Sequence, residues 1–172
     1  SLIRSRKNRE AETMVESLSD FLRLTLRIDP NVDITLGEEI ALQSLYLEIE
    51  RSRFPHRLQV TIDVPERLRS ACVPNLILQP LIENAIKHGV AQSSRLVHLE
   101  LIAAEEEGRL RLEVRDDGGD APQQLLASSR VGLANVAERL RVHFGDEADL
   151  RAGPRPGGGF AARIDMPLRH AA

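Results

Sequence analysis

The chain has 172 residues, of which 42% are hydrophobic and 28% charged, with 23 Lys and Arg against 26 Asp and Glu. This is enough for one globular domain with a buried core, and the near-balanced charge argues against a general nucleic-acid binder. The single cysteine, Cys72, excludes an internal disulfide and favours a reducing, cytoplasmic location. No apolar run approaches the roughly 20 residues of a membrane-spanning helix. We therefore expect no membrane contact by this chain, and any anchor of a parent protein would lie outside it.

The N-terminal third contains two predicted helices. Apolar residues recur at helical spacing over residues 8–27 and form one stripe. The members of this stripe are Met14, Leu18, Phe21, Leu22 and Thr25. A second helix is predicted over residues 35–54, because Thr35 and Glu38 have the spacing of a capping box. An apolar stripe on a lone terminal helix needs a partner, so we expect the first helix to be a separate element.

The rest of the chain alternates strands with two more helices. In chain order, the predicted elements are strand 58–64, helix 76–88, strands 96–103 and 110–114, helix 133–144, and strands 149–152 and 160–166. Pro80 requires that its helix either begins just before it or is kinked there. Gly145 supplies the stop of the helix over 133–144. Helices and mostly antiparallel strands in mixed order predict an α+β fold, a two-layer α/β sandwich.

The most informative segment is residues 78–89, which read LQPLIENAIKHG. On a helix with about 100° per residue, Asn84, Lys87 and His88 share the polar face and Glu83 lies at its edge. An amide or carboxylate oxygen suits Mg²⁺, and a lysine suits phosphate oxygens. This helix could therefore bind a magnesium–nucleoside triphosphate. The alternative is an ordinary amphipathic helix with a solvated polar face.

Three glycine-containing segments complete the candidate site. Asp116 ends an alternating strand shortly before Gly118, so its carboxylate could accept a hydrogen bond from an exocyclic amine such as that of adenine. Gly132 lies just before a predicted helix, where free N–H groups and the helix dipole favour a phosphate. A run of three glycines, 157–159, precedes the last strand. The plain alternatives are an Asp-Gly turn, an N-cap glycine and a flexible hairpin turn.

In this order, the four segments resemble the N, G1, G2 and G3 boxes of the ATPase family that includes gyrase, Hsp90, histidine kinases and MutL. The finer resemblance is to sensor histidine kinases of the LytS type. It is carried by residues 18–26 (LSDFLRLTL), 34–40 (ITLGEEI), 46–50 (YLEIE), 53–54 (RF), 78–89 and 132–140 (GLANVAERL). It implies the Bergerat ATP-binding fold for residues 33–172. Residues 1–28 would be the trailing part of the dimerisation and histidine phosphotransfer helices.

The resemblance also implies a role for each site residue. Asn84 would bind Mg²⁺, and Glu83 would be a general base or polar orienter for phosphoryl transfer. Lys87 and His88 would contact the phosphates or the lid. Asp116 would bind the adenine amino group, with Gly118 giving room. Gly132 and Leu133 would contact the phosphates at the start of a helix. Catalysis would rest on positioning and on charge neutralisation.

Three positions depart from the family pattern. Asp120 stands where the G1 box usually has its second glycine, Arg130 where the G2 box often has its first glycine, and Phe160 where the G3 box commonly has threonine. A negative Asp120 would weaken nucleotide binding, whereas Arg130 could donate a hydrogen bond to a phosphate. Both effects are hypotheses about an otherwise familiar nucleotide site.

The implied function is that of a protein histidine kinase. Such an enzyme transfers the ATP γ-phosphate to a histidine and onward to an aspartate of a response regulator, in this family often of the LytTR type. None of the five histidines lies in the P-H-F-L-F-N stretch of the family, so we expect the phosphoacceptor outside this chain and no self-phosphorylation. A homodimer through the first helix is also implied. Two alternatives stay open: a nucleotide-binding regulatory module without transfer, and an interaction domain without nucleotide. The segment before residue 56 argues against a serine kinase of the anti-sigma type.

Overall fold

The computed structural model describes residues 14–16, 18–23, 32–118 and 126–170, with only the backbone described for residues 126–130. Five strands form a sheet in the order β2-β4-β5-β7-β6. They are β2 (Leu58–Asp63), β4 (Val97–Glu106), β5 (Arg109–Asp116), β7 (Phe160–Pro167) and β6 (Asp149–Pro154). β2 and β4 pair in parallel, whereas the other neighbours are antiparallel. The predicted strands are all present, within three residues of their expected bounds.

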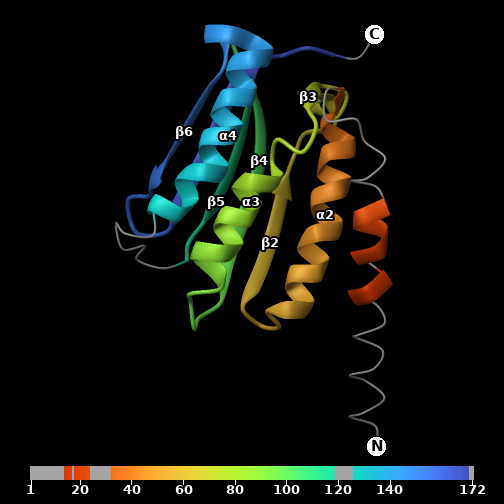
Figure 1. The fold of residues 1–172 in the computed structure, drawn as a ribbon. Coiled ribbons are helices and arrows are strands. Elements are labelled where there is room, and N and C mark those ends of the chain that lie inside the picture. Colours follow the sequence, from red (N-terminus) through yellow and green to blue (C-terminus); the bar gives the residue numbers. More distant parts are fainter. Residues whose placement is uncertain (1–13, 17, 24–31, 119–125, 171–172) are drawn as a thin grey trace, which may run out of the picture.

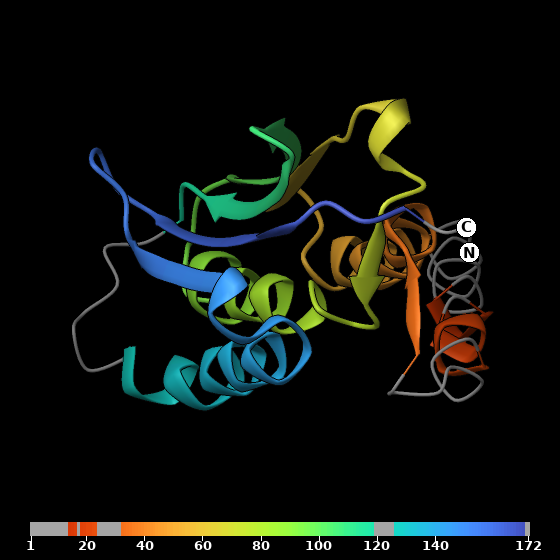
Figure 2. The ribbon, with the colours of Figure 1, turned by 90° about the horizontal axis from the view of Figure 1, so that it is seen from above.

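Helices cover one face of this sheet, which confirms the two-layer sandwich (Figures 1 and 2). They are α2 (Leu36–Arg53), α3 (Gln79–Asn84) and α4 (Leu126–Phe144). Two short turns connect other elements: η1 (Glu66–Leu68) lies between β2 and β3 in the chain, and η3 (Gly145–Glu147) lies between α4 and β6. The other sheet face is charged: Arg115 Nε lies 2.6 Å from Glu100 Oε2, and Arg111 Nε lies 3.0 Å from Asp165 Oδ1. An antiparallel sheet with one packed and one solvated face has this alternation.

The capping box at the start of α2 is confirmed. The Thr35 N–H donates to Glu38 Oε2 at 2.8 Å, and the Glu38 N–H donates to Thr35 Oγ1 at 3.2 Å. Just before this helix, β1 (Asp33–Thr35) pairs antiparallel with β3 (Cys72–Pro74) in a small second sheet. These strands were not predicted, because three residues are too few to show alternation.

The helix with the sequence LQPLIENAIKHG begins at Gln79, so Pro80 lies in its first turn. A proline there removes an N–H that would have no partner within the helix, and no kink is needed. After Asn84 the chain continues as a π-helix, η2 (Ala85–Val90). The Ala91 N–H, for example, donates to Ile86 O at 2.8 Å, five residues back. Turns of this kind occur frequently at functional sites.

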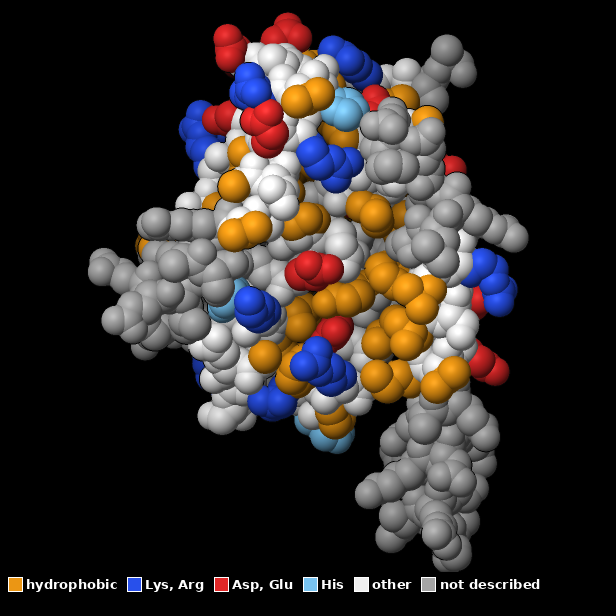
Figure 3. Space-filling view, viewed as in Figure 1, with side chains coloured by type: hydrophobic (Ala, Val, Ile, Leu, Met, Phe, Trp, Pro, Cys, Tyr) orange, Lys and Arg blue, Asp and Glu red, His pale blue; other side chains and the backbone are white. Residues whose placement is uncertain are grey.

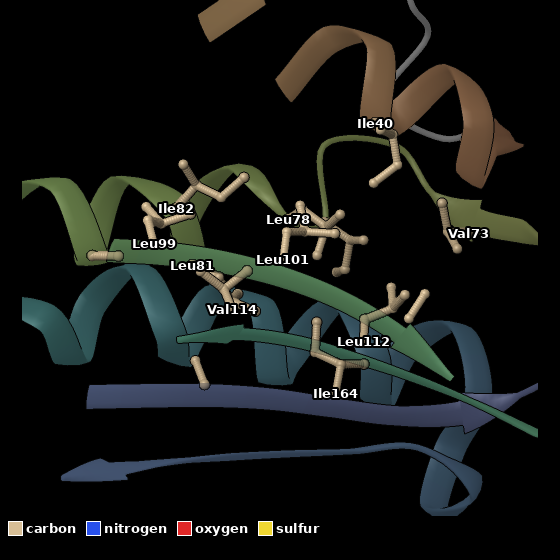
Figure 4. Close-up of a cluster of buried hydrophobic side chains, with 14 of the residues drawn as sticks. Ile40, Val73, Leu78, Leu81, Ile82, Leu99, Leu101, Leu112, Val114 and Ile164 are labelled. Atoms are coloured by element: carbon tan, nitrogen blue, oxygen red, sulfur yellow. The ribbon is translucent and has the colours of Figure 1, made fainter. Parts of the chain in front are cut away.

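The core lies between the sheet and helix α3. Strand β5 alternates strictly, with every second side chain directed into the core. Figure 4 shows the facing side chains of the two layers, each at most 2% exposed. They are Leu99 and Leu101 of β4, Leu112 and Val114 of β5, Ile164 of β7, and Leu78, Leu81 and Ile82 at and within α3. This packing fixes the helix that carries the candidate site onto the sheet.

The described part of the first helix, residues 14–16 and 18–23, lies beside α2 (Figures 1 and 2). The ring of Phe21 lies 5.8 Å from that of Tyr46 on α2, measured between centroids. Other apolar side chains of this helix are exposed to solvent, with Val15 at 63% and Leu18 at 43%. Figure 3 shows hydrophobic side chains gathered over this part of the molecule. No helix among the described residues has both the length and the apolar character to cross a membrane.

Candidate functional site

The candidate site forms where η2 meets the end of strand β5. Asp116 is the last residue of β5, and the residue is only 2% exposed. Gly89 in η2 lies directly against it: a Cβ atom at position 89 would stand 2.5 Å from Asp116 Oδ1. The structure therefore brings together two of the segments that the sequence had singled out. Gly89 itself was not predicted as a site residue, although it belongs to the informative motif.

Two further glycines pack closely at the same strand end, Gly118 beside the Asp116 carboxylate and Gly159 against the Asp116 main chain. Gly118 donates its N–H to Asp116 Oδ1 at 3.0 Å, and a Cβ on it would lie 2.6 Å from the Cα of Gly89. Gly159 has a φ of +83°, and a Cβ there would collide with the Asp116 carbonyl oxygen. The run of glycines before the last strand thus does more than turn the chain, because its last member packs against the candidate site.

Arg155 also holds this strand end, and nothing in the sequence marked it. Its Nη1 donates to the Asp116 carbonyl oxygen at 2.9 Å. Burial raises the pKa of the Asp116 carboxyl to about 7, against the lowering effect of the Gly118 N–H. A buried carboxylate with a raised pKa in contact with glycine backbone suits a ligand that donates a hydrogen bond.

Asn84 ends α3, and its side chain is directed into the molecule. The residue is 9% exposed, and Oδ1 has no hydrogen-bond partner in the described part of the chain. A buried amide oxygen without a partner is costly unless something else occupies it. Mg²⁺ is a suitable occupant, because it prefers oxygen ligands and keeps several waters. Among the described residues, no group of three or more His, Cys, Asp or Glu is placed to hold a metal ion, so most ligands of such an ion would come from a nucleotide and water.

Lys87 and His88 follow in η2 and differ in environment. Lys87 is exposed, so its ammonium can reach a phosphate at the surface. His88 is buried, and its Nδ1 has no hydrogen-bond partner among the described residues. Burial, together with the neighbouring Lys87, lowers the pKa of His88. A neutral His88 can take part in hydrogen bonds with a ligand but carries no charge to attract a phosphate.

Glu83 lies on the outer side of α3, one residue before Asn84. It is exposed, and its Oε1 accepts a hydrogen bond from Gln79 Nε2 at 2.8 Å. Burial raises the pKa of Tyr46 on α2, and the nearby carboxylates of Glu50 and Glu83 raise it further. Glu83 therefore lies on the side of α3 that is near α2, where Tyr46 also contacts Phe21 of the first helix.

The prediction for Gly132 and Leu133 is wrong in one respect. Helix α4 begins at Leu126, not at Leu133, so both residues lie inside the helix. Their N–H groups are not among the first four, which alone lack a partner within the helix. Gly132 packs near Pro80 of α3, with 3.8 Å between a Cβ on it and the Cβ of Pro80, and Leu133 packs against the core. The side chain of Arg130 and the whole of Asp120 lie outside the described residues.

Comparison with known proteins identifies the family. A sequence model of histidine kinases matches residues 1–58, and one of histidine kinase-, DNA gyrase B- and HSP90-like ATPases matches residues 74–170. The second match covers more than half of the chain. The chain belongs to this ATPase family. The chain therefore contains the ATPase domain found in sensor histidine kinases.

Curated relatives confirm the resemblance to LytS-type sensor kinases. Sensor histidine kinase BtsS of Escherichia coli is 35% identical over 164 residues, which cover 95% of this chain and 29% of the relative. Sensor histidine kinase YesM of Bacillus subtilis is 30% identical over 98% of this chain and 30% of the relative. Sensor protein LytS of Bacillus cereus is 30% identical over 82% of this chain and 26% of the relative. The chain thus spans less than a third of the length of these relatives.

Solved structures support the fold. The histidine kinase domain of the Erythrobacter litoralis blue-light activated histidine kinase superposes with a TM-score of 0.61 at 21% identity, over 96% of this chain and 83% of that one. The catalytic domain of histidine kinase ThkA gives a TM-score of 0.61 at 16% identity, over 79% of this chain and 94% of that one. At these identities the likeness establishes the shared fold alone.

Proposed function

We propose that this chain is the ATP-binding catalytic domain of a two-component sensor histidine kinase. It transfers the γ-phosphate of ATP to a histidine outside this chain, from which the phosphate passes to an aspartate of a response regulator, with the LytTR type as the expected regulator class. Residues 33–172 form the catalytic domain, and residues 1–28 belong to the dimerisation and phosphotransfer helices. The observation that carries the proposal is the buried, unpartnered Oδ1 of Asn84 on the helix that touches Asp116.

The two ends of the site would hold the two ends of ATP. Asp116 accepts a hydrogen bond from the adenine amino group, and the glycines at 89 and 118, which lack Cβ atoms, allow the backbone to pack closely around its carboxylate. Asn84 Oδ1 is the ligand for Mg²⁺, which neutralises phosphate charge when bound. Lys87 contacts the phosphates through its exposed ammonium. His88, kept neutral by its surroundings, contributes a hydrogen bond rather than a charge.

Glu83 is the candidate general base or orienter. Its carboxylate is near enough to Tyr46 to raise the pKa of that side chain, and Tyr46 contacts Phe21 of the first helix. Glu83 therefore lies on the side of α3 that faces the first helix, which resembles the phosphotransfer helices of the family. A carboxylate there can accept a proton from an attacking imidazole or hold that ring in its reactive tautomer. The exposed stripe of the first helix, including Val15 and Leu18, supports a homodimer formed through this helix.

The test is a transfer assay with γ-labelled ATP in the longer parent protein that carries the phosphoacceptor histidine. We expect labelling in the wild type, a loss of labelling in Asn84→Ala at ATP concentrations near the wild-type Kd because binding of the magnesium nucleotide is weakened, and little labelling in Glu83→Gln although nucleotide still binds. Glu66→Gln is the matched control, because Glu66 is exposed on η1, far from the site in sequence. ATP binding without any labelling would favour the regulatory module, and no binding at millimolar ATP with Mg²⁺ would favour an interaction domain.

A further inference from the structure

The helix that carries Asn84 lacks a cap of its own. Its N-cap residue is Leu78, whose side chain has no hydrogen-bonding atom. The first N–H groups of a helix have no partner within it and must be satisfied from outside. Here the partner comes from another helix: Glu39 of α2 accepts the Leu78 N–H on Oε1 at 2.9 Å and the Leu76 N–H on Oε2 at 2.8 Å. The two oxygens of one carboxylate thus accept hydrogen bonds from two backbone N–H groups of the same turn.

The Glu39 side chain is buried and held in place by its neighbours. The residue is 0% exposed, and Gln43, one turn further along α2, donates from Nε2 to its Oε1 at 3.2 Å. Burial raises the pKa of Glu39, while the Leu78 and Leu76 N–H groups and the charge of Arg139 oppose that rise. Removing a carboxylate from water is costly, but a leucine of similar size would leave the Leu76 and Leu78 N–H groups without this acceptor. The buried carboxylate is therefore explained by the loop that it holds and not by packing alone.

The loop that Glu39 holds is strained and is tied from a second side. Leu76 has a φ of +55°, a left-handed conformation that costs a non-glycine residue about 1–3 kcal/mol and persists only where its surroundings enforce it. Arg139 of α4 donates from Nη2 to the carbonyl oxygen of Asn75 at 2.5 Å. Helices α2 and α4 thus both hold the loop from Asn75 to Leu78 immediately before α3.

We infer that Glu39 is a positioning residue for nucleotide binding. By capping α3 from α2, it fixes where this helix begins, and hence where Asn84 lies, six residues or roughly 9 Å further along the helix. A helix transmits a shift of its first turn along its length, so an unsatisfied start would move the amide oxygen that meets Mg²⁺. The inference rests on the proposed function, because positioning matters only if Asn84 takes part in nucleotide binding.

The experiment compares two variants of matched stability. Glu39→Gln keeps the size of the side chain but turns an N–H₂ group toward one of the two backbone N–H donors. Leu47→Ala removes a buried side chain from the same helix without touching the loop before α3, and such truncations cost about 2–5 kcal/mol. For each variant, thermal unfolding, the Kd for a non-hydrolysable ATP analogue with Mg²⁺, and hydrogen exchange of the Leu76 and Leu78 amides are measured.

We expect Glu39→Gln to raise the Kd at least about tenfold, equal to 1.4 kcal/mol, and to lose protection at the two amides. Leu47→Ala should lower the unfolding temperature, and at temperatures well below that transition it should leave the Kd unchanged. A wild-type Kd in Glu39→Gln would overturn the positioning role and leave only a stabilising one. Full protection of the two amides would overturn the capping role. If the wild-type chain binds no nucleotide, the proposed function itself is contradicted. This result can be told apart from the failure of the positioning role and from the failure of the capping role.

A second variant covers the case in which Glu39→Gln does not fold. Arg139→Gln removes the guanidinium that holds Asn75 and leaves the Glu39 contacts in place. We expect a rise in Kd of about threefold, or 0.6 kcal/mol, with a loss of stability no larger than that of Leu47→Ala. An unchanged Kd in Arg139→Gln would show that the position of the loop has no bearing on nucleotide binding.

Discussion

The backbone of Gly89 lies against the carboxylate of Asp116 so closely that a methyl group at position 89 would stand 2.5 Å from Oδ1. This contact joins the end of the N-box helix to the end of strand β5 and leaves no space for any other residue type. It sets the geometry of the adenine side of the proposed site.

Gly89→Ala is therefore expected to displace Asp116 or the end of η2. Overpacking of this kind costs about 1–3 kcal/mol of stability, and we expect the Kd for ATP to rise at least about tenfold. Calorimetric titration and chemical denaturation measure the two effects. Gly153→Ala is the control, because a Cβ at position 153 meets nothing within 4 Å; equal effects of both substitutions would contradict the contact.

The raised pKa of Asp116 predicts a pH-dependent stability. In the unfolded chain the carboxyl ionises near 3.8, and in the folded chain near 7. Between these values the folded state binds the extra proton, so this group makes folding less favourable as the pH rises. The free energy of unfolding of the nucleotide-free chain should thus fall between about pH 4 and about pH 7. Asp116→Asn should show a smaller fall; an identical pH profile would contradict the assignment.

The same carboxyl predicts a pH-dependent affinity. A carboxylate accepts a hydrogen bond from an amino group, whereas a carboxylic acid presents a competing donor. The Kd for adenosine, which has no phosphates to titrate, should therefore decrease as the pH rises through about 7. Titrations of wild type and Asp116→Asn on either side of this pH give the comparison. Affinity that changes equally in both proteins would assign the effect to another group.

Asn84→Ala should weaken ATP binding in a magnesium-dependent way. The buried Oδ1 is lost while the surrounding apolar packing stays. In excess Mg²⁺ we expect the Kd to rise about tenfold or more, and with a chelator the gap from wild type should shrink to about threefold or less. Gln59→Ala removes an exposed amide on β2 and serves as the control. A gap that is the same with and without Mg²⁺ would mean that Asn84 contacts something other than the metal.

The exposed stripe of the first helix predicts self-association. Val15 and Leu18 lie three residues apart, on one side of the helix. We expect a concentration-dependent dimer in sedimentation equilibrium, and we expect Val15→Glu with Leu18→Glu to be monomeric. Ser19→Glu adds a charge at an exposed polar position and should leave the association unchanged. A strict monomer at high wild-type concentration would count against this interface.

Local signals predicted much of this fold. The capping box at Thr35 and Glu38, the strict alternation of β5 and the stop at Gly145 are each determined by neighbouring residues, and each is present. The start of α4 was misplaced at Leu133, since a glycine usually marks a helix end. Gly132 instead lies inside the helix, where a Cβ on it would make an ordinary contact of 3.8 Å with the Pro80 Cβ.

Two separate motifs singled out Asn84 and Asp116 as candidates, and the structure brings their segments together. The way the candidate site is built was not predicted, since the π-helical turn after Asn84 has no sequence signal that we recognised. The cap by Glu39 joins positions 37 and 39 residues apart in the chain, and such long-range pairing cannot be read from local spacing. Arg155 was missed for the same reason, since only the fold brings it to Asp116.

The cap from α2 also bears on how such kinases can be recombined. The ATPase family match begins at residue 74, which suggests a natural point for exchanging one catalytic domain for another. An exchange there would separate Leu76 and Leu78 from Glu39, and it would divide β3, which pairs with β1, before its last residue Pro74. The incoming N-box helix would then pack beside the α2 of another protein, which need not have a carboxylate at the position of Glu39. Chimeric kinases joined before Asp33 keep both pairs together and should inherit the nucleotide affinity of the donor.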